Sequence, residues 1–279
     1  MISTLFVDKL LLDALNEDLP YGDISTNSII EINSICTVDL ISKDFGIIAG
    51  LPIFKRVFEL LGDVNVEFLK KDGDDIIPNE ILARISGKTS NILTGERTAL
   101  NFLQRLSGVA TLTREYVKKL EGTNTMLLDT RKTTPNLRVL EKYAVKIGGG
   151  NNHRFNLSDG VMLKDNHISA AGCIKNAVVY ARCNASFVRK IEVEVENLEM
   201  VYEALEAKVD IIMLDNMDLE TIRVAVQIIG NKAITEASGN VELNNIRDIA
   251  QTGVDYISVG SITHSAPILD LSMKNLKIL

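Results

Sequence analysis

The segment that decides the fold is KIEVEVENLEMVYEALEAKVDIIMLDNMDLETIRVAVQIIGNKAITEASGN (Lys190–Asn240). It contains short apolar runs that end in charged or small polar residues, namely Lys190–Val195, Ile211–Leu214 and Ala233–Thr235. Between these runs lie stretches of helical length and periodicity, Leu198–Ala207 and Leu219–Ile229. Strands that alternate with helices in this way predict parallel βα units.

The same rhythm continues on both sides of this segment. Further strand-like runs are Met126–Leu128, Gly160–Leu163 and Tyr256–Val259, and further helical stretches are Ala171–Ala181 and Leu243–Thr252. Six strands over about 140 residues fit a βα barrel, complete or open, better than a long open sheet. No GxGxxG follows the first strand, which disfavours a dinucleotide-binding fold.

The first part of the chain has a different pattern. Strand-like runs occur at Ile35–Ile41, Val64–Leu69 and Glu80–Ile85, with a polar turn at Lys71–Asp75. The last two runs alternate apolar and polar residues, as half-exposed strands do. These features predict an α+β domain on a mostly antiparallel sheet.

Two helices are expected in this first part. A helix over Thr94–Ser107 ends before Gly108. An N-terminal amphipathic helix is also expected, with Phe6, Leu10, Asp13/Ala14 and Glu17 spaced by about one turn. The rhythm of the chain changes just after Gly108, so we expect a domain boundary there.

Composition excludes several classes of protein. The 279 residues predict about two domains, and 46% hydrophobic with 24% charged residues is typical of a globular enzyme. A net charge of −7 argues against general nucleic-acid binding. No apolar stretch reaches the ~20 residues of a membrane helix, and the N-terminus has no signal-peptide pattern. Three cysteines without a CxxC pair, Cys36, Cys173 and Cys183, indicate reduced thiols in a cytoplasmic protein.

Cations cluster at the predicted strand ends. Arg131, Lys132, Arg154 and Lys164, together with His153, fall within about 35 residues, beside a glycine-rich corner. In a barrel these side chains converge on one mouth, because the carboxyl ends of the strands form one face. Converging cations repel one another, so the expected ligand is a polyanion.

Carboxylates follow two neighbouring strands. Glu194 and Asp215 can bind vicinal hydroxyls, hold Mg²⁺ or stabilise a positively charged transition state. Glu192 and Glu196 share the parity of Glu194, so alternation alone does not choose among these three glutamates.

Small polar residues mark a candidate phosphate site. Ser238-Gly239-Asn240 precedes a predicted helix near Leu243, and Gly260-Ser261 follows the last predicted strand. Backbone N–H groups at a helix N-terminus bind phosphate, and barrels often bind phosphate on the loops of their last strands.

The run DTRKTTPNLRVLEKYAVKIGGGNNHRFNLSDGVMLKDNHI (Asp129–Ile168) resembles the signature of the quinolinate phosphoribosyltransferase family. Other segments similar to the family occur in the family's order, and the resemblance covers essentially the whole chain. These are EDLPYGDIST (Glu17–Thr26), ERTALNFLQRLSGVAT (Glu96–Thr111), IEVEVENLEM, IIMLDN, EASGN and TGVDYISVGSITHS.

The resemblance implies an N-terminal α/β sandwich domain joined to an open six-stranded βα barrel. The sandwich would comprise residues 1–108, with residues 267–279 returning to it, and the catalytic barrel residues 109–266. The implied reaction joins quinolinate and phosphoribosyl diphosphate with decarboxylation, giving nicotinate mononucleotide, diphosphate and CO₂ in NAD biosynthesis. The family works as a homodimer with Mg²⁺.

The resemblance also assigns roles to particular residues. Arg105 would reach into the partner's site, and Lys132 would lie near the diphosphate. Glu194 and Asp215 would contact the ribose or its magnesium, mainly through substrate and water. The groups around the pyridine dicarboxylate would be Arg131, His153, Arg154 and Lys164, and Thr130 would also bind substrate. The 5′-phosphate cradle would be Ser238, Gly239, Asn240, Gly260 and Ser261. Lys132, Lys164, Glu194 and Asp215 would be catalytic, and the role of His264 stays open.

Two positions depart from the family pattern, which usually has glycine at Asn136 and at Asn240. We expect the turns to survive, because asparagine tolerates positive φ better than other non-glycine residues. The alternative functions are a related phosphoribosyltransferase-like protein of molybdenum metabolism, a non-catalytic phosphate-binding barrel and a sugar-phosphate isomerase barrel. The segment Lys164–His167 favours the quinolinate enzyme over the first of these.

Overall fold

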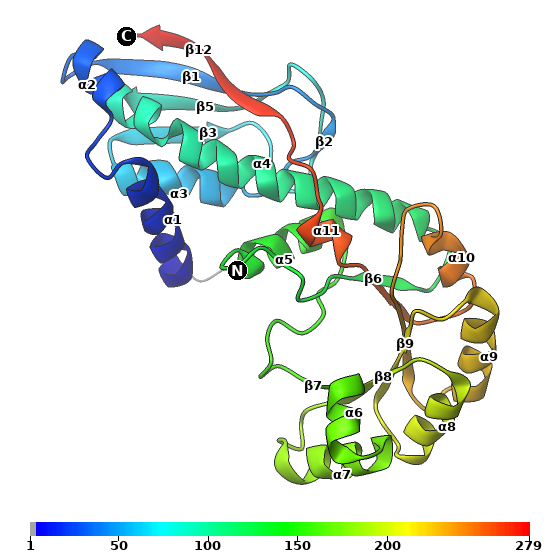
Figure 1. The fold of residues 1–279 in the computed structure, drawn as a ribbon. Coiled ribbons are helices and arrows are strands. Elements are labelled where there is room, and N and C mark those ends of the chain that lie inside the picture. The colour runs from blue at the N-terminus through cyan, green and yellow to red at the C-terminus, as the bar shows by residue number, and fades with distance from the viewer. Residues whose placement is uncertain (1–3) are drawn as a thin grey trace. The chain divides into compact units, whose positions relative to one another are not determined.

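The structure is a computed structural model and describes residues 4–279. It divides into two compact units, which are described separately (Figure 1). The first unit contains the chain up to Arg114, Thr134–Gly149 and Ser265–Leu279, and the second contains Glu115–Thr133 and Gly150–His264. Residues 134–149, expected in the barrel, thus fall in the first unit.

The first unit is built on a four-stranded sheet in the order β12-β1-β5-β3. All neighbouring strands are antiparallel, which confirms the predicted sheet type. Alternate residues of β1, such as Cys36, Val38 and Leu40, are buried, so one face of the sheet forms the core. The strands are β1 (Ile35–Ser42), β3 (Val64–Phe68), β5 (Ile81–Lys88) and β12 (Leu271–Ile278), with β2 (Gly46–Ile47) and β4 (Asp75–Ile76) as a small second sheet.

The helices of this unit correct one expectation. Helix α1 packs on α3 and buries Val7, Leu11 and Leu15, whereas Phe6 is exposed. Helix α4 does not end before Gly108. The helices are α1 (Thr4–Asp18), α2 (Ile24–Ile29), α3 (Leu51–Leu61), α4 (Thr89–Lys119) and α5 (Arg138–Gly148).

Gly108 is a packing position rather than a helix stop. A Cβ atom at Gly108 would overlap the carbonyl of Pro267, so only glycine allows the returning chain to pass this close. Gly148 plays the same part for α5, since its Cβ would clash with Ala110 and Thr113 of α4. This close approach explains why residues 134–149 cluster with the first unit.

The second unit contains a parallel sheet in the order β6-β11-β10-β9-β8-β7. Strands β6 and β7 are its two edges and do not pair with each other within residues 4–279, which confirms an open six-stranded βα barrel (Figure 1). The strands are β6 (Met126–Leu128), β7 (Val161–Leu163), β8 (Ile191–Val195), β9 (Ile211–Asp215), β10 (Ile234–Ser238) and β11 (Tyr256–Ser258).

Helices α8 and α9 follow strands and are capped by polar side chains at their first turns. Asn197 accepts a hydrogen bond from the Met200 amide, and Asp218 accepts one from the Thr221 amide. No helix within residues 4–279 is long and apolar enough to cross a bilayer. The helices are α6 (Asp165–Ala171), α7 (Ile174–Asn184), α8 (Leu198–Glu206), α9 (Leu219–Ile229), α10 (Ile246–Ala250) and α11 (Ser261–His264).

Two boundaries in this unit differ from the sequence prediction and bear on the site. Strand β10 runs to Ser238, so Glu236 lies inside the strand and not in a polar corner after it. Helix α10 begins at Ile246 instead of near Leu243, and it has only five residues. Its N-terminus therefore does not follow Ser238-Gly239-Asn240 directly, and the expected helix-terminus phosphate site is wrong in that detail.

Candidate active site

The carboxyl ends of the strands in the second unit enclose one cavity of about 770 Å³. Every predicted site residue except Arg105 lines it. The predicted residues at the cavity are Thr130, Arg131, Lys132, His153, Arg154, Lys164, Glu194, Asp215, Ser238, Gly239, Asn240, Gly260 and Ser261, and His264, Met162, Met213, Asn216, Glu236 and Ser258 lie among them.

Two guanidinium groups lie close together on the wall of this cavity. Arg154 donates to the carbonyl of Gly160 at 3.0 Å and approaches the sulfur of Met162 at 3.6 Å. Burial lowers the pKa of Arg154, and the positive charge of Arg131 lowers it further. Like charges held together in a partly buried site favour a bound anion, and guanidinium groups match carboxylates in geometry.

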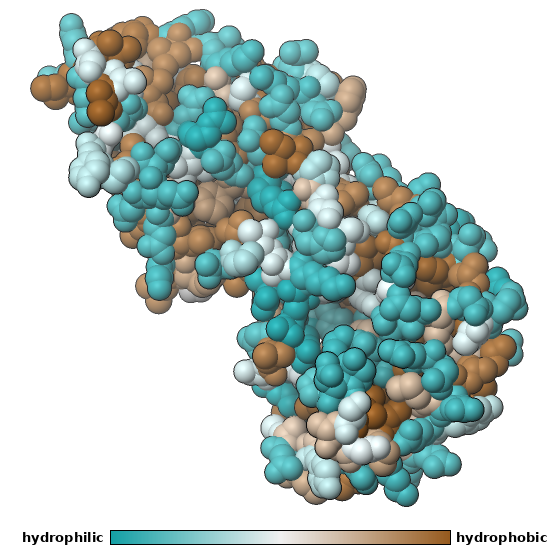
Figure 2. Space-filling view, viewed as in Figure 1, coloured by the Kyte–Doolittle hydropathy of each residue, from teal (hydrophilic) through white to brown (hydrophobic). Residues whose placement is uncertain are grey.

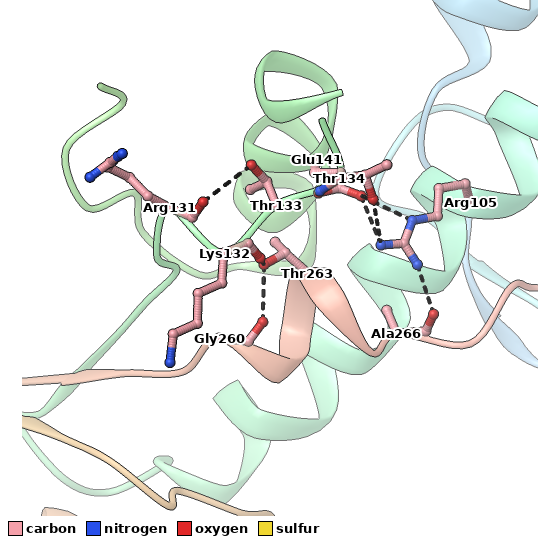
Figure 3. A network of polar contacts seen from close by, with 9 residues as sticks. All are labelled: Arg105, Arg131, Lys132, Thr133, Thr134, Glu141, Gly260, Thr263 and Ala266. Carbon is pink, nitrogen blue, oxygen red and sulfur yellow. Dashed lines mark hydrogen bonds and ion pairs between the residues drawn. The ribbon is translucent and has the colours of Figure 1, made fainter. Parts of the chain in front are cut away.

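The two lysines of the cavity are held differently. Lys164 forms an ion pair with Glu194. Lys132 is fixed through its backbone, because its amide donates to Thr130 Oγ1 at 2.9 Å and its carbonyl accepts from Thr263 Oγ1 at 2.8 Å. Figure 3 shows the Lys132 side chain extended away from these backbone contacts.

The carboxylates of Glu194 and Asp215 end neighbouring strands. Asp215 accepts a hydrogen bond from Asn216 Nδ2 at 2.6 Å, and Glu194 is paired with Lys164. Among residues 4–279, neither belongs to a group of three side chains spaced to hold a metal. Mg²⁺ commonly keeps several waters and binds one or two carboxylates together with substrate phosphates. These two carboxylates could hold a magnesium ion through water.

The segment after β10 has the backbone geometry of a close-approach turn. Gly239 has a φ of +92°, and a Cβ there would collide with the side chain of Asn216. Asn240 has a φ of 50° and donates from Nδ2 to Asn216 Oδ1 at 3.0 Å. Asn136, the other departure from the family pattern, has a φ of 65°. Both asparagines therefore adopt the left-handed conformation expected of them.

Sequence reasoning missed a buried cluster beneath this cavity. His153 Nε2 lies 3.3 Å from Glu192 and 3.3 Å from Glu236, and both glutamates are buried. Burial lowers the pKa of His153, but hydrogen bonds to the two carboxylates raise it more strongly, to about 10. Burial also raises the pKa of Glu192. The alternation of side chains along the strand did show that Glu192 and Glu194 share a face, but it did not show which of them is buried.

This cluster has the ligand types of a metal site, but its hydrogen bonds do not fit one. The amide of Arg154 contacts His153 Nδ1 at 2.7 Å, and Nε2 lies 3.3 Å from each of the two glutamates. The raised pKa of His153 favours the protonated ring, so Nε2 carries a hydrogen toward these carboxylates. A metal needs the Nε2 lone pair, and we therefore assign the cluster to hydrogen bonding.

Arg105 lies in the first unit and is bound there. It donates to Glu141 Oε1 from Nε at 3.0 Å and from Nη2 at 2.7 Å, and to the carbonyl of Ala266 at 2.8 Å (Figure 3). Glu141 is fully buried and also accepts from the amide and hydroxyl of Thr134. This network fixes the position of the Arg105 guanidinium.

Comparisons with known proteins identify the family. The model of the quinolinate phosphoribosyl transferase N-terminal domain matches residues 23–107, and that of its C-terminal domain matches residues 109–274. The chain belongs to the quinolinate phosphoribosyltransferase family. This family membership confirms the resemblance found in the sequence.

Relatives within the quinolinate phosphoribosyltransferase family are similar over nearly the whole chain. A probable nicotinate-nucleotide pyrophosphorylase [carboxylating] of Bacillus subtilis is 46% identical over 267 residues, which cover 95% of this chain and 92% of the relative. A chloroplastic nicotinate-nucleotide pyrophosphorylase [carboxylating] of Arabidopsis thaliana is 40% identical, with 94% and 80% covered. The crystal structure of NadC from Streptococcus pyogenes has a TM-score of 0.97 and 47% identity, with 100% of this chain and 99% of that chain covered.

Proposed function

We propose that this chain transfers the phosphoribosyl group of phosphoribosyl diphosphate to quinolinate with decarboxylation. The products are nicotinate mononucleotide, diphosphate and CO₂, so the enzyme is a pentosyltransferase of NAD biosynthesis. The names of its relatives support this activity. The observation that carries the proposal is the cavity that Arg131, Lys132, Arg154 and Lys164 line together with Glu194 and Asp215.

The cations bind two anionic substrates in one place. Arg131, Arg154 and Lys164 bind the carboxylates of quinolinate, with His153 beside them, and Lys132 binds the diphosphate. Bringing both reactants into one cavity makes their encounter local, which removes much of the entropic barrier. The 5′-phosphate is held by the turn at Ser238-Gly239-Asn240 together with Gly260 and Ser261.

The ring nitrogen of quinolinate attacks the ribose carbon as the bond to diphosphate breaks. Positive charge develops on the ribose, and the carboxylates of Glu194 and Asp215 stabilise that charge. The pyridine nitrogen becomes cationic and draws electrons from the adjacent carbon, so the carboxylate on that carbon leaves as CO₂. No general base is needed to begin this sequence.

Magnesium is part of the proposed substrate complex. Glu194 and Asp215 would hold Mg²⁺ through its water shell, and the ion would supply positive charge that neutralises the leaving diphosphate. Lys132 contributes a second positive charge at the same group. We expect activity to require Mg²⁺ for this reason.

We further propose that the enzyme is a cytoplasmic homodimer in which Arg105 reaches the site of the partner subunit. A cluster of exposed apolar side chains on the first unit supports association, and Figure 2 shows apolar residues gathered around α2. These residues are Ile24, Ile29, Ile32, Ile278 and Leu279. Mixing Arg105→Ala subunits with Lys164→Ala subunits tests the shared site, because activity should reappear in mixed dimers. No recovery would argue against it.

The activity is tested by incubating the purified chain with quinolinate and phosphoribosyl diphosphate, with and without Mg²⁺. We expect nicotinate mononucleotide, diphosphate and CO₂ in equal amounts only when magnesium is present. Formation of none of these products would contradict the proposed function. Replacing quinolinate with nicotinate is the specificity control, because nicotinate lacks the carboxylate that is lost.

A further inference from the structure

A buried polar cluster lies beneath the cavity of the second unit, at a depth where barrels usually place branched apolar side chains. Its members are His153, Glu192 on β8 and Glu236 on β10, and the two glutamates are 4% and 2% exposed. Burying charged groups costs free energy, and apolar side chains of similar size often stabilise a fold equally well or better. The stability of the barrel therefore does not explain this cluster.

His153 is held at both nitrogens of its ring. Nε2 lies 3.3 Å from a carboxylate oxygen of Glu192 and 3.3 Å from one of Glu236. Nδ1 lies 2.7 Å from the amide nitrogen of Arg154, and the backbone amide of His153 donates to Asp129 Oδ1 at 2.8 Å. Burial lowers the pKa of His153, but hydrogen bonds to both carboxylates raise it to about 10. The two glutamates therefore dominate the surroundings of the ring.

The ring is in contact with a cation of the cavity. Arg154 follows His153 in the chain, and its amide contacts the ring. The Arg154 side chain is held farther along the chain, by the Gly160 carbonyl at 3.0 Å and the Met162 sulfur at 3.6 Å. His153 and Arg154 both line the cavity. The place from which the Arg154 side chain starts therefore depends on the orientation of the His153 ring.

The two glutamate side chains make their direct contacts with this ring. Among residues 4–279, neither Glu192 nor Glu236 has a side-chain ion pair with any residue other than His153. Glu192 does not line the cavity, and Glu236 Oε1 is buried from solvent. These carboxylates are poorly placed to bind a substrate themselves, so an effect on substrate passes through His153.

We propose that Glu192 and Glu236 are positioning residues for the dicarboxylate substrate, an inference that rests on the proposed function. By holding the His153 ring, they fix the main chain from which Arg154 reaches a carboxylate of quinolinate. The proposed partners of phosphoribosyl diphosphate, Lys132 and the turn after β10, do not belong to the cluster. Loss of a cluster carboxylate therefore weakens the binding of quinolinate and leaves that of phosphoribosyl diphosphate unchanged.

The test compares two substitutions, Glu236→Leu and Glu236→Gln. Leucine fills a similar volume but accepts no hydrogen bond, so KM for quinolinate should rise about tenfold, the scale of one lost hydrogen bond to a charged group. Glutamine keeps an oxygen that can accept from Nε2, and it should recover most of this loss. KM for phosphoribosyl diphosphate should stay at the wild-type value in both variants. Glu199→Leu is the matched control, because Glu199 is exposed on α8 and does not line the cavity.

An equal rise in both KM values, or an unchanged KM for quinolinate in Glu236→Leu, would overturn the proposal. Wild-type protein that forms no product would instead contradict the proposed function. Both KM values should stay at the wild-type level in Glu199→Leu.

A second measurement does not depend on activity. NMR titration of the His153 ring should give a pKa well above its ordinary value of 6.5 in the wild type and a lower pKa in Glu236→Leu, because one of the two carboxylates that raise it is gone. The same titration in both proteins would overturn the proposal, because Glu236 would then not act on the ring. A wild-type pKa at or below 6.5 would overturn it without any variant.

Discussion

The two units of this chain use charged side chains in opposite ways. In the first unit the charges are tied internally, as in Arg105 with Glu141 and Arg56 with Asp8. At the cavity of the second unit, Arg131 and Arg154 lie close together with like charge, and Glu236 Oε1 has no hydrogen-bond partner among residues 4–279. The difference indicates that these charges of the first unit stabilise the fold, whereas the guanidinium groups at the cavity favour a bound anion.

The largest expected effect is on catalysis in the second unit. Arg154→Ala removes a guanidinium that binds a substrate carboxylate, so kcat/KM for quinolinate should fall by about a thousandfold. Lys132→Ala should act mainly through phosphoribosyl diphosphate. Steady-state kinetics with each substrate varied separately checks both. Unchanged kcat/KM for quinolinate in Arg154→Ala would contradict the assignment of Arg154 to a substrate carboxylate.

The matching prediction for the first unit concerns stability. Glu141→Gln removes the fully buried carboxylate that binds Arg105, and the free energy of unfolding should fall by about 3 kcal/mol. Glu59→Gln, which alters an exposed pair with Arg56, should cost less than about 1 kcal/mol. Urea unfolding measures both. An equal loss of unfolding free energy in the two variants would show that the buried network stabilises the fold no more than the exposed ion pair does.

Two glycines sharpen the contrast between fold and site. Gly239→Ala would force a Cβ against Asn216 at positive φ, and we expect about a tenfold rise in KM for phosphoribosyl diphosphate. Gly108→Ala would press on the Pro267 carbonyl and should lower stability by about 2 kcal/mol. Kinetics and thermal unfolding of both variants separate the effects. A Gly239→Ala enzyme with an unaltered KM would remove this turn from the phosphate site.

The His153 cluster should make stability depend on pH. The pKa of His153 is raised from 6.5 to about 10 in the folded state. Between these two pH values the folded protein therefore binds more protons than the unfolded chain. The contribution is complete below pH 6.5 and is lost as the pH rises through about 10. Urea unfolding across this range should show a fall in stability that His153→Gln reduces. An identical fall in that variant would assign the effect to other groups.

The smallest effect is expected at Asn240. Its φ of 50° is one that glycine adopts freely, so Asn240→Gly should change stability by less than about 1 kcal/mol. The variant loses only the hydrogen bond to Asn216. Thermal unfolding and the KM for phosphoribosyl diphosphate check this expectation, and a large loss in either would mean that the Asn216 contact organises the turn.

The sequence predicted the barrel and its mouth because both depend on local pattern. Short apolar runs, helical spacing and strand ends are visible without tertiary contacts, so Asp215 and Lys164 could be placed at the cavity in advance. The antiparallel sheet of the first unit could be predicted for the same reason, since β3 and β5 alternate apolar and polar residues.

Features that depend on depth or on distant contacts could not be predicted. Glu236 was placed in a polar corner because it is charged, whereas the structure buries it within β10 beside His153. Gly108 was taken as a helix end, but its partner is Pro267, far along the chain. The buried stripe of α1 depends on α3, which a pattern of one helix does not reveal.

The central claim is that the cations of the barrel mouth bind the pyridine dicarboxylate. A crystal structure of this chain with quinolinate bound tests that claim most directly. We predict that the ligand occupies the cavity of the second unit, with its carboxylates within hydrogen-bond distance of the guanidinium groups of Arg131 and Arg154. Quinolinate bound elsewhere, or bound in the cavity without contact to either arginine, would contradict the account.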